Sequence, residues 1–555
     1  MLQRRWWHYL CACVVLATFS ARTSAAEPSV AFSINAGDTL IGLSERVFVS
    51  PDAWREIAVL NRLNKPYLLV PGQVLQVPVR LLRWTAAAST LTSVSGEVRV
   101  DGRAGAALET LNEGQSIETG LQGSAVLELA DQSIIKLAPS SLAEVVTSRR
   151  HTASGDGASS PSTGLFSGVL RVLRGSVEVF ATKVLRAKPL EVNTPTAVVG
   201  VRGTQYRVGF DEAANRSTRT EVIEGQVRFD AGANANATAA TRANGADVSG
   251  GFGAAVDAAG AAPTVVKLLV APDLASTPER FERPIVRFGL AAEVQPLRLQ
   301  VAADAEFNKV VRDLRVEPGT EVRVAGLDDG QWHLRARRVD PLGIEGFDAV
   351  RPFVLKARPE PPAPSQPRRG AKQTVGAVEF AWAQNVEAGS HRLQIARDQA
   401  FKDVVLDRDA VPGTAVRVDM PAQGSYFWRL ASIRPNGDPG PFGDPLSFEL
   451  RATPEPPKGG LGGDGGLAFN WAGRPQDRQQ VELARDTEFK DIVAKAELTT
   501  SEWVLPKPDR AGDYFFRYRS IEPDGFVSPY SSTLKIVVPK DWSSLWLLFT
   551  LLFVL

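Results

Sequence analysis

The sequence predicts a multidomain, mainly β protein, and three observations carry this prediction. The chain has 555 residues with 44% hydrophobic content, which is enough for several domains with their own cores. Its 37 prolines and 47 glycines indicate many turns and linkers. From residue 92 to about 229, short runs of alternating apolar and polar residues indicate strands, with almost nothing at helical period. We expect a small βααβ module, then an all-β domain, then three β-sandwich repeats.

The first 26 residues have the features of a secretory signal peptide. Arg4 and Arg5 precede an apolar stretch at 10–17, and Ser24-Ala25-Ala26 forms a small-residue cleavage site. We therefore expect residues 1–26 to be removed when the protein is exported.

The mature chain is expected to lack cysteine and to be close to neutral. Both cysteines, Cys11 and Cys13, lie in the predicted signal peptide, which excludes disulfides and thiol catalysis in the mature chain. The whole chain has 63 basic and 62 acidic residues, and loss of the three arginines of the signal peptide leaves a formal charge of −2. This balance predicts no nucleic-acid partner.

Residues 28–80 have the pattern of the βααβ module. Alternating apolar residues at 30–34 predict a short strand, and residues 37–39 supply a turn with a capping side chain before a first helix. The segment 50–52 (Ser-Pro-Asp) predicts the start of a second helix, with serine as the N-cap and proline in the first helical position. A second strand at 74–77 can pair with the first and close a two-layer core.

Three segments of this module carry a resemblance to a known family. They are Ile34 to Leu40 (INAGDTL), Asn61 to Asn64 (NRLN) and Pro71 to Pro78 (PGQVLQVP). With these segments the module resembles the LysM domain, whose members bind N-acetylglucosamine-containing glycans such as peptidoglycan and chitin. The resemblance implies a shallow glycan groove between the loop after the first strand and the loop before the second. The glycan-binding positions that it implies are Gly37, Asp38, Thr39 and Leu40 on one side, and Lys65, Pro66, Leu69, Val70 and Pro71 on the other.

Some of these positions have a second interpretation. Backbone groups of such loops can pair with an acetamido group, while apolar side chains cover its methyl group and the face of the sugar. Leu40, Leu69 and Val70 can equally belong to the core, and the two interpretations are balanced for each of them.

Residues 92–230 are expected to form the all-β domain. Short strands with glycines occur at 94–98, 123–129 and 173–179, and the segment 194–208 is TPTAVVGVRGTQYRV. In this order the segments resemble the FecR domain, which implies a periplasmic protein. Founding members of that family relay signals to a sigma factor, which needs a cytoplasmic domain and a membrane-spanning helix ahead of the periplasmic part. Here the predicted signal peptide and module take that place, so the resemblance implies a periplasmic scaffold that contacts an unknown envelope protein.

Residues 231–270 are rich in Ala and Gly and are expected to be mostly linker. Three internal repeats follow at 271–357, 358–453 and 454–540. Three sets of marker residues recur with the same offsets of 94 and 88 positions: Phe307, Phe401 and Phe489; Trp332, Tyr426 and Tyr514; Pro341, Pro435 and Pro523. At about ninety residues each, the repeats resemble fibronectin type III or related immunoglobulin-like modules. Their aromatic residues are expected to fill the layer between two sheets, and the alternative is a carbohydrate-binding surface.

Residues 541–555 are a hydrophobic tail. Leu545 to Leu555 are eleven consecutive apolar or Thr residues, and Trp542 and Trp546 lie at their start. As a helix with a rise of ~1.5 Å per residue this run reaches ~16 Å, which is short of a ~30 Å hydrocarbon core. We expect contact between this tail and a membrane surface, with the tryptophans at the headgroups. Docking on a partner, or membership of a longer segment, is the alternative.

The sequence contains no catalytic constellation, and we expect no cofactor and no bound metal. The three histidines of the mature chain, His151, His333 and His391, lie far apart without metal-ligand spacing. We therefore expect a non-catalytic protein that binds peptidoglycan in the periplasm of a Gram-negative-type bacterium. The alternative is a sensory or regulatory periplasmic protein of the FecR type that passes a signal to a membrane partner.

Overall fold

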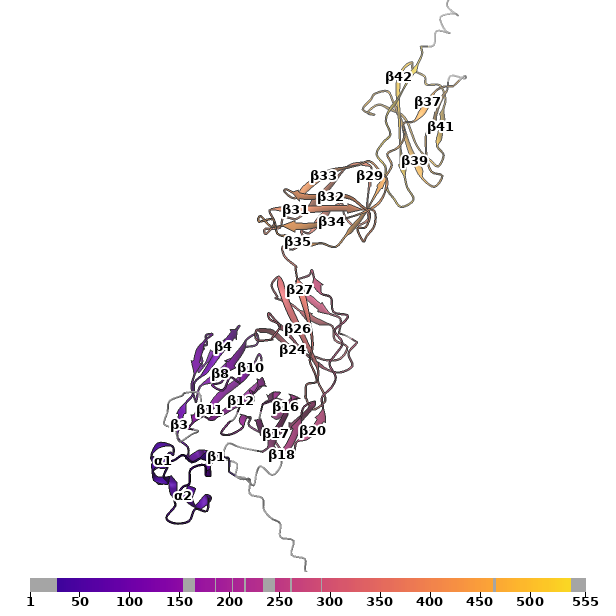
Figure 1. Ribbon diagram of the computed structural model, residues 1–555. Helices are drawn as coiled ribbons and strands as arrows, with labels where there is room; N and C mark the ends of the chain where they lie inside the picture. The colour runs from indigo at the N-terminus through magenta and orange to yellow at the C-terminus, as the bar shows by residue number, and fades with distance from the viewer. Residues whose placement is uncertain are drawn as a thin grey trace, which may run out of the picture. The chain divides into compact units, whose positions relative to one another are not determined.

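The computed structural model describes residues 27–540 except 153–164, 185, 202, 214–215, 233–244, 260–261, 291 and 463–465 (Figure 1). The predicted signal peptide, residues 1–26, and the hydrophobic tail, residues 541–555, lie outside the described residues. The chain divides into two compact units, with the division between Leu355 and Lys356. Both units consist mainly of strands in several separate sheets, which confirms the predicted fold class.

The first unit begins with the βααβ module. Strands β1 (Ser29–Ser33) and β2 (Val74–Pro78) pair antiparallel, and helices α1 (Leu40–Arg46) and α2 (Ala53–Leu60) lie between them in the chain. A single 3-10 turn, η1 (Val79–Leu81), follows β2. Helices and strands share one core, whose central side chains are Phe32, Leu43, Phe48, Ile57, Leu75 and Val77.

Ser50 caps the turn that leads into helix α2. Asp52 is the residue that precedes the helix, and the hydroxyl of Ser50 accepts the N–H of Asp52 at 3.3 Å. A bond to the N–H two residues ahead is the bond that an N-cap side chain makes, and the backbone of Asp52 is already in the right-handed helical region, so Ser50 caps this end as predicted.

The all-β domain is one closed, hydrogen-bonded system of strands from Trp84 to Lys267. The strands are β3 (Trp84–Ala86), β4 (Ser89–Ser95), β5 (Val98–Val100), β6 (Arg103–Ala104), β7 (Glu109–Leu111), β8 (Ser116–Thr119), β9 (Ser124–Glu128), β10 (Ile134–Leu137), β11 (Leu142–His151), β12 (Leu165–Phe180), β13 (Leu190–Asn193), β14 (Ala197–Val201), β15 (Gln205–Asp211), β16 (Ser217–Glu224), β17 (Gln226–Ala231), β18 (Gly245–Ser249), β19 (Phe252–Val256) and β20 (Thr264–Lys267). Inward-facing residues of these strands form a single hydrophobic core.

The long strand β12 connects two parts of this domain. Its first half pairs with β11 and, in parallel, with β13, whereas its second half pairs with β10 and β15. The change of partners falls at Gly175, where φ is +79°. A Cβ at this position would lie 2.4 Å from the hydroxyl of Ser141, so the bend requires glycine.

The interval 231–270, which we expected to be mostly linker, contains strands β18, β19 and β20. Strand β18 pairs with β17, and β19 pairs with β16 and β20. Val248, Ala254 and Val256 are buried in the core of the all-β domain. Strands that extend an existing sheet need few large apolar residues of their own, which is why the Ala- and Gly-rich composition did not reveal them. This corrects the linker assignment.

The first repeat completes the first unit. It contains β21 (Arg280–Phe281), β22 (Val286–Phe288), β23 (Leu297–Ala302), β24 (Val310–Val316), β25 (Val322–Val324), β26 (Gly330–Arg338) and β27 (Ala349–Leu355). These strands form a five-stranded sheet, β21-β27-β26-β23-β24, and a two-stranded sheet, β22-β25. Phe281, Phe288 and Phe353 pack edge to face, with ring centroids 5.4–5.5 Å apart.

The second unit contains the other two repeats. The second repeat has β28 (Pro364–Gln366), β29 (Ala371–Thr374), β30 (Gly376–Trp382), β31 (Ser390–Ala396), β32 (Val404–Val411), β33 (Ala415–Met420), β34 (Gly424–Ile433), β35 (Pro439–Phe442) and β36 (Leu446–Arg451). The third has β37 (Lys458–Leu461), β38 (Leu467–Asn470), β39 (Arg478–Ala484), β40 (Ile492–Leu498), β41 (Glu502–Leu505), β42 (Gly512–Ile521) and β43 (Leu534–Val538). In each repeat a sheet of three strands accompanies a larger sheet, β29-β36-β34-β31-β32 or β40-β39-β42-β43.

The three repeats share one unusual turn. Phe307, Phe401 and Phe489 have φ values of 57°, 57° and 55°, a left-handed conformation that bulky residues rarely adopt. In each repeat the aspartate three residues earlier accepts backbone N–H groups from the residues that follow the phenylalanine. An arginine guanidinium covers each ring: Arg335 at 4.3 Å, Arg429 at 3.9 Å and Arg517 at 3.8 Å. The residues that recur at offsets of 94 and 88 therefore make the same contacts in each repeat.

The aromatic markers of the repeats are mainly core residues. Phe288, Trp382 and Trp471 are 1%, 4% and 8% exposed. A second marker bonds to the backbone carbonyl four residues upstream in each repeat: Trp332 to Asp328, Tyr426 to Ala422 and Tyr514 to Arg510. Tyr426 and Tyr514 are buried in the cores of their repeats, as expected for a sandwich, whereas Trp332 is half-buried.

Candidate functional site

The two loops that the sequence assigned to a glycan groove lie side by side. The N–H of Gly72 donates to the carbonyl of Ile34 at 2.8 Å, and the N–H of Ile34 donates to the carbonyl of Gln73 at 2.8 Å. These bonds continue the pairing of β1 with β2 into the loops. The order of elements in the module therefore brings residues near 37 next to residues near 71.

In the first loop, side chains hold the backbone in shape. The Asp38 carboxylate accepts the N–H of Asn35 at 2.8 Å and pairs with Arg46, and its side chain is only 6% exposed. The hydroxyl of Thr39 caps α1 by accepting the N–H of Gly42 at 3.1 Å. Gly37, at φ +87°, has no atom within 4 Å of where a Cβ would stand. The backbone at Gly37 is therefore open to solvent.

The second loop offers an exposed surface. Lys65, Pro66 and Pro71 are exposed, and Val70 is 63% exposed. Leu69 is half-buried against the core of the module. Val70 is thus a surface residue.

The side chain of Leu40 is a core residue. It is 4% exposed and packs with Phe32 and Leu43, so it cannot cover a sugar on the surface. This corrects its assignment to the groove.

Sequence reasoning missed two exposed apolar residues beside the loops. Ile41 is 59% exposed and Leu68 is 77% exposed. The helical period contained the signal for Ile41, because Leu40 and Leu43 both face the core and a residue directly after Leu40 must point elsewhere. No comparable signal marked Leu68, which lies in an irregular loop.

A second candidate site lies where the all-β domain contacts the first repeat. Ten charged residues gather there, and we refer to them as the junction. The junction consists of Glu178, Arg207, Arg219 and Glu221 from the all-β domain, and Arg298, Asp313, Arg335, Arg337, Glu345 and Asp348 from the first repeat.

Glu345 lies at the centre of the junction. Its carboxylate accepts hydrogen bonds from Arg337 Nη1 at 2.9 Å, from Arg219 Nη2 at 3.0 Å and from Arg298 Nη1. Its backbone N–H donates to Glu221 Oε1 at 3.1 Å. The Glu345 side chain is 3% exposed, so these charge-assisted bonds are formed away from water.

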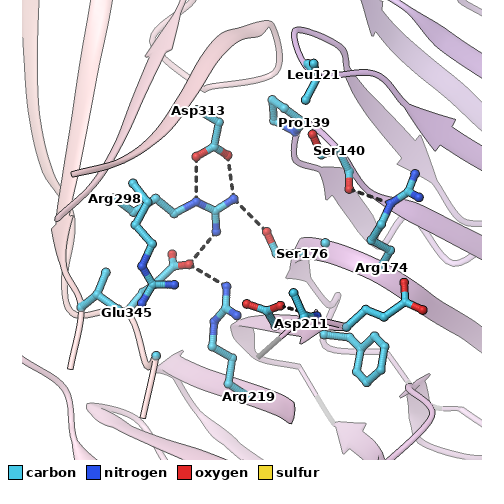
Figure 2. Close-up of a pocket in the computed structure, with 17 residues that line it drawn as sticks. Leu121, Pro139, Ser140, Arg174, Ser176, Asp211, Arg219, Arg298, Asp313 and Glu345 are labelled. Atoms are coloured by element: carbon cyan, nitrogen blue, oxygen red, sulfur yellow. Dashed lines mark hydrogen bonds and ion pairs between the residues drawn. The ribbon is translucent and has the colours of Figure 1, made fainter. Parts of the chain in front are cut away.

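Two arginines of the first repeat reach the all-β domain. Arg298 binds both carboxylate oxygens of Asp313, at 2.9 and 2.6 Å, and donates to Ser176 Oγ at 2.9 Å across the junction (Figure 2). Arg335 donates to Glu178 at 3.1 Å across the junction. A buried charge that loses its partner is strongly destabilising, so these bonds tie the two domains to each other.

The pKa values of Glu178, Glu345 and Asp348 are shifted in one direction and that of Glu221 in the other. Burial by itself would raise the pKa of Asp348, of Glu178 and of Glu345, but the surrounding arginines hold all three pKa values below their usual range. Burial, together with the nearby charge of Glu345, raises the pKa of Glu221. The junction therefore contains three carboxylates stabilised in the charged form and one that is destabilised in it.

An open cavity of about 580 Å³ lies against the junction. Figure 2 shows Arg174, Arg219 and Arg298 around it, together with Asp313 and Glu345. Four arginines and four carboxylates line the cavity, and neither histidine nor cysteine is among its described lining residues. Its charged walls can bind a polar ligand of mixed charge.

No sequence signal pointed to the junction. Charged and polar residues alternate with apolar ones in the sequences of β23 and β26, and such residues look like an ordinary solvated face. Among the described residues, no cluster of His, Cys, Asp or Glu suits a metal ion. Neither α1 nor α2, the helices in the described part of the chain, is long and apolar enough to cross a membrane.

Comparison with protein families supports the two resemblances. The LysM domain model matches residues 33–78, and the FecR protein model matches residues 115–228. The first match supports a glycan-binding module, and the second supports a domain related to signalling. Both families are non-catalytic binding or regulatory domains and are typical of cell-envelope proteins. No curated protein matches the chain.

Several solved structures resemble parts of the chain at low identity. A putative anti-sigma factor from Parabacteroides distasonis is 14% identical, over 27% of this chain and 59% of its own length, with a TM-score of 0.21. The FN1–FN3 domains of chicken CNTN1 are 13% identical over 44% of this chain and 90% of their own, with a TM-score of 0.20. Fibronectin(III)-like modules of Clostridium thermocellum CbhA are 10% identical over 32% of this chain and 93% of their own, with a TM-score of 0.20. The chain thus spans less than two thirds of the anti-sigma factor.

Proposed function

We propose that this protein is a non-catalytic component of the bacterial cell envelope that binds peptidoglycan through residues 28–80. The observation that carries the proposal is the match of residues 33–78 to the LysM domain. The adjacent loops around Gly37 and Val70 support it, because they combine an open backbone with exposed apolar side chains. Such a surface can bond the acetamido group of N-acetylglucosamine and cover the face of the sugar.

In this proposal the glycan-binding residues are a revised set. The backbone of Gly37, Asp38 and Thr39 forms one side, and Lys65, Pro66, Leu69, Val70 and Pro71 form the other. Leu68 joins the second side because it is exposed in the same loop, and Leu40 is left out because it is buried. The FecR-like domain and the three repeats then present surfaces to protein partners.

A sacculus-binding assay with the mature chain tests the proposal. Leu68→Asp and Val70→Asp place a charge where the sugar face would pack, and we expect binding to purified sacculi to fall by about tenfold or more, which corresponds to ~1.4 kcal/mol. Val59→Asp is the matched control, because Val59 is 79% exposed but lies on α2 outside the two loops. Wild-type binding by both loop variants would overturn the assignment of the groove.

We also propose export to the periplasm of a Gram-negative-type bacterium, with residues 1–26 as the signal peptide and 545–555 as a contact with the membrane surface. The composition of both segments supports this, as does the occurrence of LysM and FecR domains in envelope proteins. Cell fractionation of the full chain and of a chain that ends at residue 540 provides the test. Equal recovery of both chains with envelope membranes would refute the role of the tail.

A regulatory role of the FecR type is the second candidate function. The match of residues 115–228 to the FecR model favours it. If the protein passes a signal to a membrane partner, a chain with intact glycan binding but a disrupted junction should change transcription of envelope genes. A chain that only tethers should leave transcription unchanged under the same substitution.

A further inference from the structure

The outer strand of the third repeat, β40, has an open edge. In the sheet β40-β39-β42-β43 it pairs with β39 alone, and no strand among the described residues pairs with its other side. Its inward residues, Ala494, Ala496 and Leu498, are half-buried against the core of the repeat. Lys495 and Glu497 are exposed on the outer face of the sheet. An open edge of this kind offers a row of N–H and C=O groups to another chain.

The corresponding edge receives another domain in the first repeat. Ile492 at the start of β40 corresponds to Val310 at the start of β24, because the repeats are offset by 94 and 88 positions. The N–H of Val310 donates to Ser124 Oγ of the FecR-like domain at 2.9 Å. Val310 is 3% exposed, whereas Ile492 is 39% exposed. This edge of the sandwich can therefore bind a partner, and in the third repeat the described residues leave it uncovered.

Pairing of β40 with β40 of a second copy of the chain has few possible registers. If the two sheets join with their outer faces on the same side, the twofold axis passes through a residue, because successive side chains point to opposite faces. An axis through Lys495 or Glu497 sets like charges directly opposite each other, which is unfavourable. An axis through Ala494 sets Lys495 opposite Val493 and brings no pair of opposite charges together.

An axis through Ala496 suits both the charges and the packing. Lys495 then lies opposite Glu497 of the second copy, and symmetry forms this pair twice. Opposite charges directly across two antiparallel strands are favourable. On the inner face Ala494 lies opposite Leu498 of the second copy, so a small side chain meets a large one on both sides of the axis.

The charges on the neighbouring strands extend this pattern. Lys495 lies opposite Glu482 of β39, and Glu482 lies opposite Arg517 of β42 and accepts two hydrogen bonds from it, at 2.9 and 2.6 Å. Glu497 pairs with Arg478 of β39, and both side chains are exposed. An exposed pair contributes little, so it does not prevent Glu497 from facing a lysine. The signs therefore alternate from Arg517 across the joined sheets to Glu497 of the second copy.

We propose that β40 pairs antiparallel with β40 of a second copy of this chain about Ala496, which joins two third repeats into one continuous sheet. The matching edge strand of the second repeat, β32, is less suited to this role. Its outward carboxylates Asp407 and Asp409 both pair with Arg392, and an axis through Arg408 would set one carboxylate against the other. The pairing of β40 is independent of any glycan bound by the N-terminal module.

Cysteine crosslinking of the mature chain tests the register. A chain that begins at Glu27 has no cysteine, because Cys11 and Cys13 precede it. Ala496→Cys sets two cysteines opposite each other, with Cα atoms about 4.5–5.5 Å apart, and oxidation should give a covalent dimer. Ala494→Cys is the matched control, because its symmetry mate lies ~13 Å or more away along the strand, too far for a disulfide.

Crosslinking of a reversible dimer accumulates with time, so a weak interface is sufficient for this test. The paired edge buries less than the ~1,600 Å² of a standard stable interface, and we expect reversible association. Equal crosslinking of Ala496→Cys and Ala494→Cys would refute the register. No crosslinking of Ala496→Cys would mean that Lys495 keeps the edge free of partners, as lysines on edge strands do, and would overturn the proposal.

Charge reversals test the pairing of Lys495 with Glu497. In sedimentation of the mature chain, Lys495→Glu and Glu497→Lys each set like charges opposite each other twice, and each should weaken self-association about tenfold or more. An equimolar mixture of the two variants restores opposite charges at both places and should associate as the wild type does. Lys535→Glu, on the opposite edge strand β43, is the control and should leave association unchanged.

Two results of the sedimentation experiment would contradict the proposal. Association that persists in both single variants would come from another surface, such as the hydrophobic tail. A mixture that associates no better than either variant alone would show that Lys495 does not face Glu497.

Discussion

The first and second repeats carry the same residues on one face of the larger sheet, yet they use them differently. Arg298, Gln300 and Asp313 in the first repeat bond to one another as Arg392, Gln394 and Asp407 do in the second. The apolar pair at the start of the next strand is Val310-Val311 in one and Val404-Val405 in the other.

The two faces differ in how much of the apolar pair is exposed. Val310 is 3% exposed, and its N–H donates to Ser124 of the FecR-like domain at 2.9 Å, whereas Val404 is 40% exposed. Arg335 adds a bond to Glu178 of the FecR-like domain at 3.1 Å. The bonds among arginine, glutamine and aspartate on this face thus form within a single sandwich. Docking of another domain on the face depends on residues from outside the repeat. Glu345, which links the two sides, corresponds to Pro439 in the second repeat.

Removal of the charge of Glu345 should have the largest effect on this comparison. Glu345→Gln leaves several buried guanidinium groups short of a counter-charge, and we expect a loss of about 3–5 kcal/mol in the stability of the junction. Hydrogen exchange of β16 and β26 measures it. Glu221→Gln is the matched control, and it should be neutral or slightly stabilising, because the charged form of Glu221 is disfavoured in the fold. Equal losses in the two variants would show that the network is not centred on Glu345.

Charging the apolar pair should distinguish the covered face from the open one. Val310→Asp buries a carboxylate against the FecR-like domain, and we expect a loss of about 3 kcal/mol or more in the free energy of unfolding. Val404→Asp places the same group in solvent, where we expect a change within about 0.5 kcal/mol. Denaturant unfolding, followed by exchange in each repeat, checks both values. A large loss in Val404→Asp would mean that the second repeat has a covered face as well.

Acid should weaken the junction before it weakens the second repeat. The pKa values of Glu178, Glu345 and Asp348 are lowered in the fold, so their stabilisation is present above the unfolded pKa of about 4 and is lost as the pH falls towards the folded values. Each such group contributes a slope of up to about 1.4 kcal/mol per pH unit. Glu221 has the opposite sign, since its raised pKa makes stability fall as the pH rises through it. Exchange of β26 and β34 between pH 5 and pH 3 should show the steeper decline in β26.

Substitutions of the aspartate in the turn that the repeats share should give the smallest difference in stability between the first and second repeats. Asp304 accepts the N–H groups of Asn308 and Lys309, and the carbonyls of Glu306 and Asn308 in the same turn accept bonds from Lys136 and Ser124. We expect Asp304→Ala to cost about 1–2 kcal/mol in the first unit, because lost turn bonds also loosen the docked loop. Asp398→Ala, in the open second repeat, should lose less. Thermal unfolding of the two variants compares them, and a larger loss in Asp398→Ala would contradict this account.

Local features of the fold were predictable, and features that depend on a neighbour were not. The alternation at 30–34 and 74–77 correctly indicated β1 and β2, and the recurrence of Phe307, Phe401 and Phe489 correctly indicated three related sandwiches. The cap at Ser50 was predictable, because its hydroxyl bonds to an N–H only two residues ahead. Strands β18 to β20 were missed, because their pairing partners provide most of what stabilises them.

The candidate glycan site was predictable in part. Three spaced segments indicated two loops, and the pairing of β1 with β2 explains why those loops are adjacent. The sequence pattern does not determine whether each side chain faces a ligand or the core. Leu40 was therefore assigned to the groove, and Leu68 was not. The mixture of basic and acidic residues in the first repeat likewise did not indicate its contact with the FecR-like domain.

By itself, then, the sequence determined the order of domains, the strand-rich class and the repeated contacts, because these depend on hydrophobic period and on residues close to one another in the chain. Tertiary structure alone decided that the FecR-like domain would cover this face of the first repeat. Arg335 meets a buried carboxylate, Glu178, from more than 150 residues earlier in the chain. The pKa of a carboxyl group depends on charges brought together by folding, which no local pattern in the sequence records.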